Sequence, residues 1–249
     1  MVVLHGMLGS SRNWLSAGAA LAEMWHVHAL DLRNHGKSPH ADTMRYDDLV
    51  DDVLAWMDAH NLERIDLMGH SMGGKVAMLL ACRYPHRVNQ LIVVDIAPKP
   101  YHAAGSRAEF AAMHEIRLSE LKSRTEAELK LETRVPDWAM RKFLTTNLER
   151  DETGGWRWSI NLAGITHALS ELESSPLGAS DQFEGRTLFL LGGKSRYVLP
   201  ADHDGIRSHF VQCKIQILPE SGHNPHMQSR NAFVAALRTW QEPLKGAVT

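Results

Sequence analysis

Short apolar segments alternate with amphipathic segments along most of the chain. The apolar segments are rich in Val, Ile and Leu, are bounded by turn residues, and comprise 1–5, 26–31, 64–70, 90–97, 186–193 and 214–219. Segments of this kind are typical of strands buried on both faces of a parallel sheet. Between them apolar residues recur at helical spacing, which predicts helices at 46–60, 72–84 and 229–241. Alternating strands and helices indicate an α/β fold with a mostly parallel central sheet flanked by helices.

The alternation stops once, between Ala97 and Arg186. This stretch has no convincing strand, and its clearest patterns predict helices at 106–132 and 136–150. An unstructured loop of this length would be uncommon in a compact domain, so we expect a helical insertion that covers one end of the sheet as a lid. The predicted division is a core of 1–98 and 184–249 with a lid of 99–183.

The composition excludes several classes of protein. A net charge of −2 gives no basic surface for nucleic acid, and the two cysteines, Cys82 and Cys213, do not form a disulfide framework. No apolar run approaches the ~18–20 residues that a membrane span requires. The first residues lack the charged region of a signal peptide. We therefore expect a cytoplasmic protein without a membrane span or a nucleic-acid partner, present as a monomer or a homodimer.

The segment Gly69-His70-Ser71-Met72-Gly73 carries the clearest chemical signal. It lies between a predicted strand and a predicted helix, the context that the G-x-S-x-G pattern needs. In this context the serine occupies a tight, strained turn and projects above the sheet, while the glycines let neighbouring backbone pass closely. The following helix directs its N-terminal N–H groups towards whatever the serine attacks. Ser71 is therefore the predicted nucleophile.

A serine that attacks a carbonyl group requires N–H donors for the developing oxyanion. One predicted donor is the backbone of Met72, directly after the nucleophile. The second should come from the loop after an earlier strand, where His5-Gly6 ends the first strand and the N–H of Met7 follows. His5 is expected to brace this loop rather than to take part in the chemistry.

Position in the chain identifies the histidine among 15 candidates. In the fold with this serine turn, the residues of the catalytic triad follow the order serine, acid, histidine. His223 lies in an S-G-H turn after the last predicted strand and before the last helix, and it is favoured over His226, three residues further on. We expect His70 to point away from Ser71, and His35 to be structural.

The carboxylate is the least obvious member of the predicted triad. Its usual position, the turn after strand 186–193, falls on Ser195, which cannot carry a negative charge. Asp95 ends strand 90–97 next to the nucleophile strand, and a buried aspartate there would be costly without a partner. Asp95 is therefore the predicted acid, with Ser195 as a supporting hydrogen-bond partner. Asp202 and Asp204 remain as alternatives, although they lie at an expected helix start where aspartate is normally a cap.

Six segments of the chain resemble the α/β-hydrolases in order and spacing. They are LHGMLGSSRNW, DLRNHGKSP, GHSMGGKVAM, VVDIAPKPY, GGKSRYV and SGH. More narrowly, they are similar to the small bacterial YbfF-type esterases and their eukaryotic ABHD-eleven-like relatives. The resemblance covers essentially the whole chain and is weakest in the predicted lid. Such hydrolases usually have two further strands before the one that ends in H-G, so the start of the chain is either truncated or built differently.

The resemblance implies the hydrolysis of small-molecule carboxylic esters, with acyl thioesters as a further class, and it implies neither a metal nor an organic cofactor. It also places Asp95 at the acid position of V-D-I-A-P. The expected reaction passes through an acyl-enzyme on Ser71. A serine nucleophile excludes hydrolases of this fold that use aspartate. A C–C hydrolase or perhydrolase with the same triad, and a small-molecule binding protein with little turnover, remain as alternatives.

Overall fold

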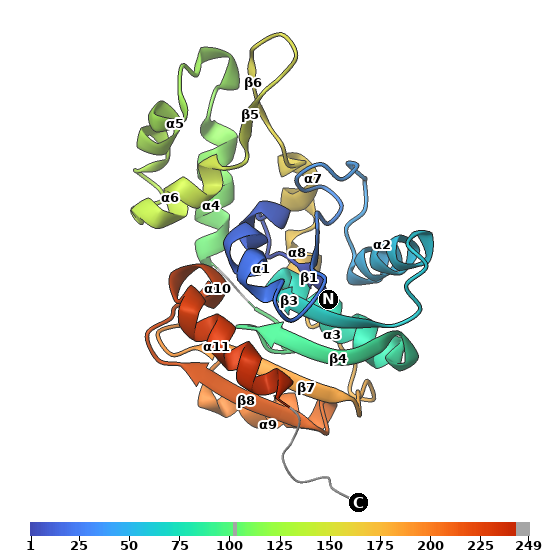
Figure 1. The fold of residues 1–249 in the computed structure, drawn as a ribbon. Helices are drawn as coiled ribbons and strands as arrows, with labels where there is room; N and C mark the ends of the chain where they lie inside the picture. Colours follow the sequence, from blue (N-terminus) through green and yellow to red (C-terminus); the bar gives the residue numbers. More distant parts are fainter. Residues whose placement is uncertain (102–103, 243–249) are drawn as a thin grey trace, which may run out of the picture.

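The computed structural model describes residues 1–101 and 104–242. Its central sheet has six parallel strands in the order β2-β1-β3-β4-β7-β8 (Figure 1). The strands are β1 (Val2–Leu4), β2 (His28–Leu30), β3 (Ile65–His70), β4 (Val88–Val94), β7 (Arg186–Gly192) and β8 (Cys213–Leu218). The predicted α/β fold with a parallel central sheet is confirmed, and each predicted strand is present with small differences at its ends.

Helices cover both faces of the sheet (Figure 1). The helices of these two layers are α1 (Leu15–Leu21), α2 (Tyr46–Ala59), α3 (Met72–Arg83), α9 (His203–His209) and α11 (Arg230–Gln241). Side chains alternate across the strands, so that Ile92 of β4 packs towards α1 and α11 while its neighbours Leu91 and Val93 pack towards α2, α3 and α9. Within the described residues, no helix combines the length and the apolar character that crossing a bilayer requires.

Among the described residues, four single turns of 3₁₀ helix and one short α-helix lie in the connections. They are η1 (Ser11–Trp14), η2 (Pro85–Arg87), η3 (Leu118–Glu120), η4 (Pro200–Asp202) and α10 (Pro225–Gln228). Of these, η1 follows the loop after β1, and α10 follows the turn after β8. Both therefore lie beside the ends of the strands where the parallel sheet presents its carboxyl edge.

A long insertion separates β4 from β7. Its elements are α4 (Ala104–Glu115), η3, α5 (Arg124–Leu131), α6 (Trp138–Thr145), β5 (Leu148–Arg150), β6 (Trp156–Trp158), α7 (Leu162–His167) and α8 (Leu169–Glu173). Its helices α4–α6 and strands β5 and β6 gather at one end of the molecule, whereas α8 lies against the core (Figure 1). The insertion is mostly helical. Residues 102–103 of the predicted lid and 243–249 of the predicted core lie outside the described residues.

The prediction that the insertion contains no strand is wrong. Strands β5 and β6 form an antiparallel pair, joined by a turn in which Gly154 has a φ of +83°. The predicted helix 136–150 therefore ends at Thr145. The predicted helix 106–132 is also interrupted, because the side chain of Ser123 accepts a hydrogen bond from the Glu126 N–H and starts α5 as a separate helix.

The last helix of the insertion is fixed to the core by a buried lysine. Lys75 of α3 donates from Nζ to the carbonyl oxygens of Leu172, Glu173 and Ser174 at 3.2, 3.3 and 2.5 Å. These carbonyls lie at the C-terminal end of α8, where helical carbonyl groups have no partner within the helix. The Tyr101 N–H also donates to Glu173 O at 2.7 Å. This bond connects the segment that enters the insertion after β4 with the segment that leaves it after α8.

Candidate active site

The turn between β3 and α3 holds Ser71 in a strained backbone conformation, with φ 51° and ψ −118°. A residue with a side chain rarely adopts a positive φ, and such strain is typical of functional turns. The two flanking glycines make the turn possible. A Cβ atom on Gly69 would lie 2.1 Å from Gly73 O, and one on Gly73 would lie 2.5 Å from His5 O. The backbone around Ser71 is therefore packed too tightly for larger residues.

Ser71, His223 and Asp95 form a continuous hydrogen-bonded chain. His223 lies between β8 and α10, and its Nδ1 is 2.8 Å from Asp95 Oδ2. A carboxylate accepts hydrogen bonds, so Nδ1 carries the proton in this contact. The opposite nitrogen, Nε2, is 3.1 Å from Ser71 Oγ and is left to accept the hydroxyl proton. The predicted nucleophile, base and acid thus lie in the arrangement that nucleophilic catalysis by serine requires.

The Asp95 side chain is buried and receives three hydrogen bonds. The residue directly follows β4, and its Oδ1 accepts from the Gly192 N–H at 2.8 Å. Its Oδ2 accepts from Ser195 Oγ at 2.5 Å in addition to His223. These donors offset the cost of burying the carboxylate. The structure therefore brings both His223 and Ser195 to the Asp95 carboxylate.

The alternative acids lie elsewhere. Asp202 accepts from the Leu199 N–H at 2.8 Å, as expected at a helix start, and forms an ion pair with Lys99 at 2.6 Å. Asp204 lies in the first turn of α9, where it is fully exposed and pairs with Arg207 at 3.7 Å. Within the described residues neither carboxylate contacts the histidine.

The other histidine candidate, His226, also lies apart from the nucleophile. Its buried ring is stacked on Trp14, with 4.3 Å between the ring centroids, and its Nδ1 has no hydrogen-bond partner among the described residues. Burial lowers the pKa of His226 to about 3, and the neighbouring His223 contributes to the same shift. The ring is therefore neutral and packs as a core side chain.

The loop after β1 lies directly against the nucleophile. A Cβ atom on Gly6 would lie 3.3 Å from Ser71 Cβ, so glycine allows the close approach. His5 braces this loop: its Nε2 accepts from the Leu32 N–H at 3.0 Å, and its Nδ1 donates to Gly6 O at 2.8 Å. His5 is buried, and this desolvation lowers its pKa and favours the neutral ring that these two bonds need.

Two backbone N–H groups near Ser71 are available to a ligand. Met72 begins α3, where the first N–H groups of a helix have no internal partner. Met7 follows Gly6 in the loop after β1. Within the described part of the chain, neither the Met7 nor the Met72 N–H has a hydrogen-bond acceptor. Both were predicted as oxyanion donors. Met72 directly follows Ser71 in the chain, and Met7 follows Gly6, which lies against Ser71.

His35, expected to be structural, holds the next part of this loop. Its Nε2 accepts from the Leu8 N–H at 3.2 Å, and its Nδ1 donates to Arg33 O at 2.9 Å. The ring is fully buried, which lowers the pKa of His35 to about 3 and keeps it neutral. Asn147 of the insertion donates to Leu8 O at 2.9 Å and connects the insertion to the same loop.

Sequence reasoning missed two side chains that contact His223, those of Tyr197 and His70; for His70 it expected only that the ring points away from the nucleophile. The ring of Tyr197 is stacked on the His223 imidazole with 3.7 Å between centroids and an angle of 11°. The Tyr197 N–H donates to Ser195 Oγ at 3.2 Å, and its carbonyl accepts from the Tyr101 hydroxyl at 2.9 Å. For Tyr197 the only signal was its place two positions after Ser195, in the segment GGKSRYV.

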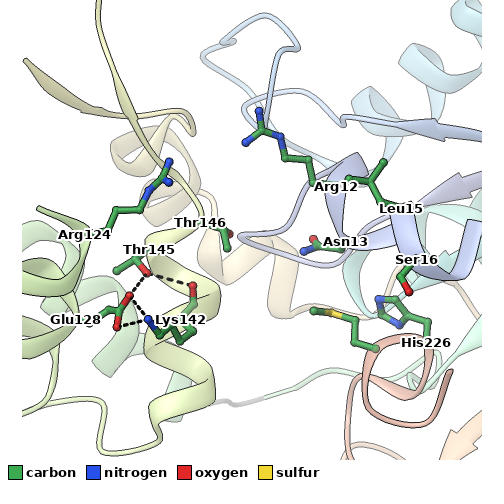
Figure 2. A pocket seen from close by; sticks show the side chains of 11 residues that line it. Arg12, Asn13, Leu15, Ser16, Arg124, Glu128, Lys142, Thr145, Thr146 and His226 are labelled. Atoms are coloured by element: carbon green, nitrogen blue, oxygen red, sulfur yellow. Dashed lines mark hydrogen bonds and ion pairs between the residues drawn. The ribbon is translucent and has the colours of Figure 1, made fainter. Parts of the chain in front are cut away.

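A cleft of about 620 Å³ lies between the insertion and the core (Figure 2). One wall comes from η1, α1 and α10 and the other from α5 and α6, where Lys142 pairs with Glu128 at 2.8 Å. His226 lies on the core wall, and its ring is 4.8 Å from that of His70, next to Ser71 in the chain. The residues that line the cleft include neither a member of the predicted triad nor a predicted oxyanion donor, and the buried rings of His226 and His70 separate it from Ser71. Its volume falls in the range of small-molecule pockets.

Residues 1–229 match the alpha/beta hydrolase fold family, and the chain belongs to that family. Curated relatives include the zebrafish (Danio rerio) sn-1-specific diacylglycerol lipase ABHD11, which is 35% identical over 98% of this chain and 78% of that protein. Esterase YbfF of Escherichia coli is 27% identical over 96% of this chain and 92% of its own length. A solved structure of a marine microorganism esterase has a TM-score of 0.92 and 35% identity, covering 96% of this chain and 93% of its own. The resemblance inferred from the motifs is confirmed.

Proposed function

We propose that this protein is a serine hydrolase that cleaves carboxylic esters of small molecules through an acyl-enzyme on Ser71. The observation that carries the proposal is the hydrogen-bonded chain from Ser71 Oγ through His223 to the buried Asp95. Three components of the reaction, a nucleophile, a base and an acid that orients the base, thereby lie in contact. The names of the relatives, which are esterases and lipases, support an ester as the substrate.

In the first half of the reaction, Ser71 Oγ attacks the ester carbonyl carbon while His223 Nε2 accepts the hydroxyl proton. The carbonyl oxygen becomes an oxyanion and receives hydrogen bonds from the N–H groups of Met7 and Met72. As the carbonyl re-forms, the bond to the alcohol breaks and His223 returns the proton to the departing alkoxide. The alcohol leaves, and the acyl group remains on Ser71.

In the second half, a water molecule attacks the acyl-enzyme and gives its proton to His223 Nε2. Collapse of the second tetrahedral intermediate releases the carboxylic acid and returns the proton to Ser71. Throughout, Asp95 holds the Nδ1–H tautomer and stabilises the imidazolium, while Ser195 helps to orient the carboxylate. The same steps apply to an acyl thioester, with a thiol as the leaving group.

The insertion, roughly residues 99–183, is proposed to act as a lid that sets the choice of substrate. Two observations support this role. The insertion forms one wall of the cleft in Figure 2, and Asn147 donates to Leu8 O in the loop that also carries Met7. A change in the insertion can therefore alter both the shape of this cleft and the position of an oxyanion donor.

Intact-protein mass spectrometry tests the proposal. After brief mixing with p-nitrophenyl esters of increasing acyl length, the wild-type protein should gain the mass of one acyl group and release p-nitrophenol continuously. Ser71→Ala should gain no acyl group, and removing a triad serine is expected to lower turnover by roughly 10⁶-fold. A wild-type protein that binds the esters without acylation or turnover would instead identify a small-molecule binding protein.

A further inference from the structure

The side chain of His70 links the nucleophile strand to the turn that carries His223. His70 is the last residue of β3, and its Nε2 lies 2.7 Å from the backbone carbonyl oxygen of His223. A carbonyl oxygen only accepts hydrogen bonds, so the proton of this contact is on Nε2. The side chain is buried, and burial, followed by the nearby His223 and His226, lowers the pKa of His70 well below its ordinary value. The ring is therefore neutral and has a single N–H to donate.

The His70 ring lies between the His223 and His226 rings and the loop after β1. Its centroid is 4.7 Å from that of His223 and 4.8 Å from that of His226. A Cβ atom on Gly6 would lie 2.8 Å from His70 Nδ1, which places the ring directly beside the loop after β1. His70 thus touches the histidine turn and the loop of the predicted oxyanion donor, and precedes Ser71 in the chain.

The carboxylate of the predicted acid and the stacked tyrosine ring hold the imidazole of His223, but its main chain has few hydrogen bonds within the described residues. Neighbouring N–H groups, those of Gly222 and Asn224, donate to the Gln228 side chain at 2.9 and 3.3 Å. Among the described residues, the hydrogen bond to the backbone of His223 itself comes from His70. Proton transfer needs Nε2 within about 2.6–3.2 Å of the serine oxygen, and the observed distance of 3.1 Å lies near the upper limit of that range. A small shift of the turn would break this contact.

We propose that His70 is a positioning residue: its Nε2–H fixes the main chain of His223 and so keeps the imidazole within proton-transfer distance of Ser71. The proposal rests on the proposed serine-hydrolase function and adds to it a residue that acts through the base. The role differs from general support of the fold, because it requires a donor at the position of Nε2 and not merely a side chain of similar volume.

A pair of substitutions with similar shape separates the donor from the volume. His70→Gln retains an N–H donor close to the position of Nε2, whereas His70→Met fills a similar space without one. With a p-nitrophenyl ester, His70→Met should lower kcat about tenfold, the loss expected for one neutral hydrogen bond, with KM changed less than twofold. His70→Gln should remain within about threefold of the wild type.

A second readout is the rate at which an alkyl p-nitrophenyl phosphonate labels Ser71, since this reaction also needs the base and is independent of deacylation. His70→Met should slow labelling by the same factor as kcat. The matched control is His209→Met, which removes another histidine–carbonyl contact, that of Nδ1 with Asp181 O at 2.6 Å, remote from the triad. Its kcat and labelling rate should equal those of the wild type.

Three outcomes would overturn the proposal. Equal losses of kcat and labelling rate in His70→Gln and His70→Met, together with equal losses of thermal stability, would indicate a purely structural residue. A His70→Met protein as fast as the wild type would show that the hydrogen bond is dispensable, while the proposed function would stand. A wild-type protein that neither cleaves the ester nor reacts with the phosphonate would refute the proposed function, and the role of His70 with it.

Discussion

The backbone conformation of Ser71 is strained and lowers the free energy of unfolding of the protein. Its positive φ is strained for any residue with a Cβ atom, and such strain typically costs ~1–3 kcal/mol. Glycine adopts this conformation freely. We therefore expect Ser71→Gly to be more stable than Ser71→Ala by about 1 kcal/mol or more, although neither variant can form an acyl-enzyme.

Urea unfolding of the two variants measures this difference. Ser71→Ala is the matched control, because it removes the hydroxyl group and keeps the Cβ atom. Equal free energies of unfolding would mean that the turn between β3 and α3 is not strained by its nucleophile, and that the positive φ is compatible with a side chain here.

A second residue-scale prediction concerns the acid. In Asp95→Asn an amide replaces the carboxylate that accepts from His223 Nδ1–H. The amide can donate to Nδ1, which favours the wrong tautomer, and it cannot stabilise the imidazolium. By analogy with the corresponding change in a serine protease, kcat should fall ~10⁴-fold. Ser195→Ala removes one neutral hydrogen bond and should lower kcat only about tenfold.

Asp202→Asn is the control for this series, because Asp202 pairs with Lys99 and caps a short helix at a distance from the histidine. Its kcat in the same p-nitrophenyl ester assay should stay near that of the wild type. A loss of ~10³-fold or more in Asp202→Asn, with Asp95→Asn still active, would show that the acid has been misassigned.

At the scale of elements, the core was more predictable than the insertion. Strands buried on both faces, such as β4 and β7, leave continuous apolar segments that the sequence displays directly. Strands β5 and β6 have three residues each and lie in a two-stranded sheet, so they show no comparable pattern. The turn that joins them did leave a signal in Gly154, and a hairpin could have been considered on that basis.

The sequence predicts those residues of the candidate site whose positions follow from the order of the strands. It does not predict contacts that depend on how side chains pack. Ser71, Asp95 and His223 each follow a strand, and parallel strands end at one edge of the sheet. The contact between Asp95 and Ser195 follows from the adjacency of β4 and β7. The stacking of Tyr197 on His223 requires side-chain positions from separate turns, and no local pattern specifies them.

The anchoring of α8 provides a prediction at the element scale. Lys75→Met would leave the carbonyls at the end of α8 without the buried ammonium group that they contact. An acceptor deprived of its buried partner typically costs ~1–3 kcal/mol. Burial lowers the pKa of Lys75 to about 7, so the comparison is made at pH 6, where the lost charge near the helix C-terminus adds to this cost. We expect the free energy of unfolding in urea to fall by about 2–3 kcal/mol.

Tyr46→Phe is the comparison, because the Tyr46 hydroxyl donates a single bond to Leu172 O at 2.6 Å. This variant should lose only about 1 kcal/mol. Limited proteolysis should show faster cleavage near Ser174 in Lys75→Met than in Tyr46→Phe. A Lys75→Met protein within about 0.5 kcal/mol of the wild type would indicate that water replaces the lysine without cost.

For the whole molecule, the buried histidines tie stability to pH. Four of them, His5, His35, His70 and His226, have lowered pKa values, mainly because they are buried. They surround the triad and serve as neutral hydrogen-bonding or packing groups. Because these imidazoles are neutral, they place no extra positive charge near His223. Unfolding exposes them to water, where they bind protons at acidic pH.

The sign of the effect follows from these pKa values. In the unfolded chain a histidine binds a proton below about pH 6.5, whereas His35 and His226 stay neutral in the folded protein down to about pH 3. Between these limits the unfolded state holds more protons, so the free energy of unfolding falls as the pH falls. Each such histidine contributes a slope of about 1.4 kcal/mol per pH unit.

His226→Leu tests this linkage for one residue. The His226 Nδ1 has no hydrogen-bond partner within the described residues, so leucine removes the titrating group without breaking a bond there. Between pH 6 and 5 the slope of the free energy of unfolding against pH, measured in urea, should decrease by about 1.4 kcal/mol per pH unit relative to the wild type. His86→Gln, which removes an exposed imidazole, is the matched control. If His226→Leu retains the wild-type slope, then His226 binds a proton equally well in both states, and its ring is not held neutral between Trp14 and His70.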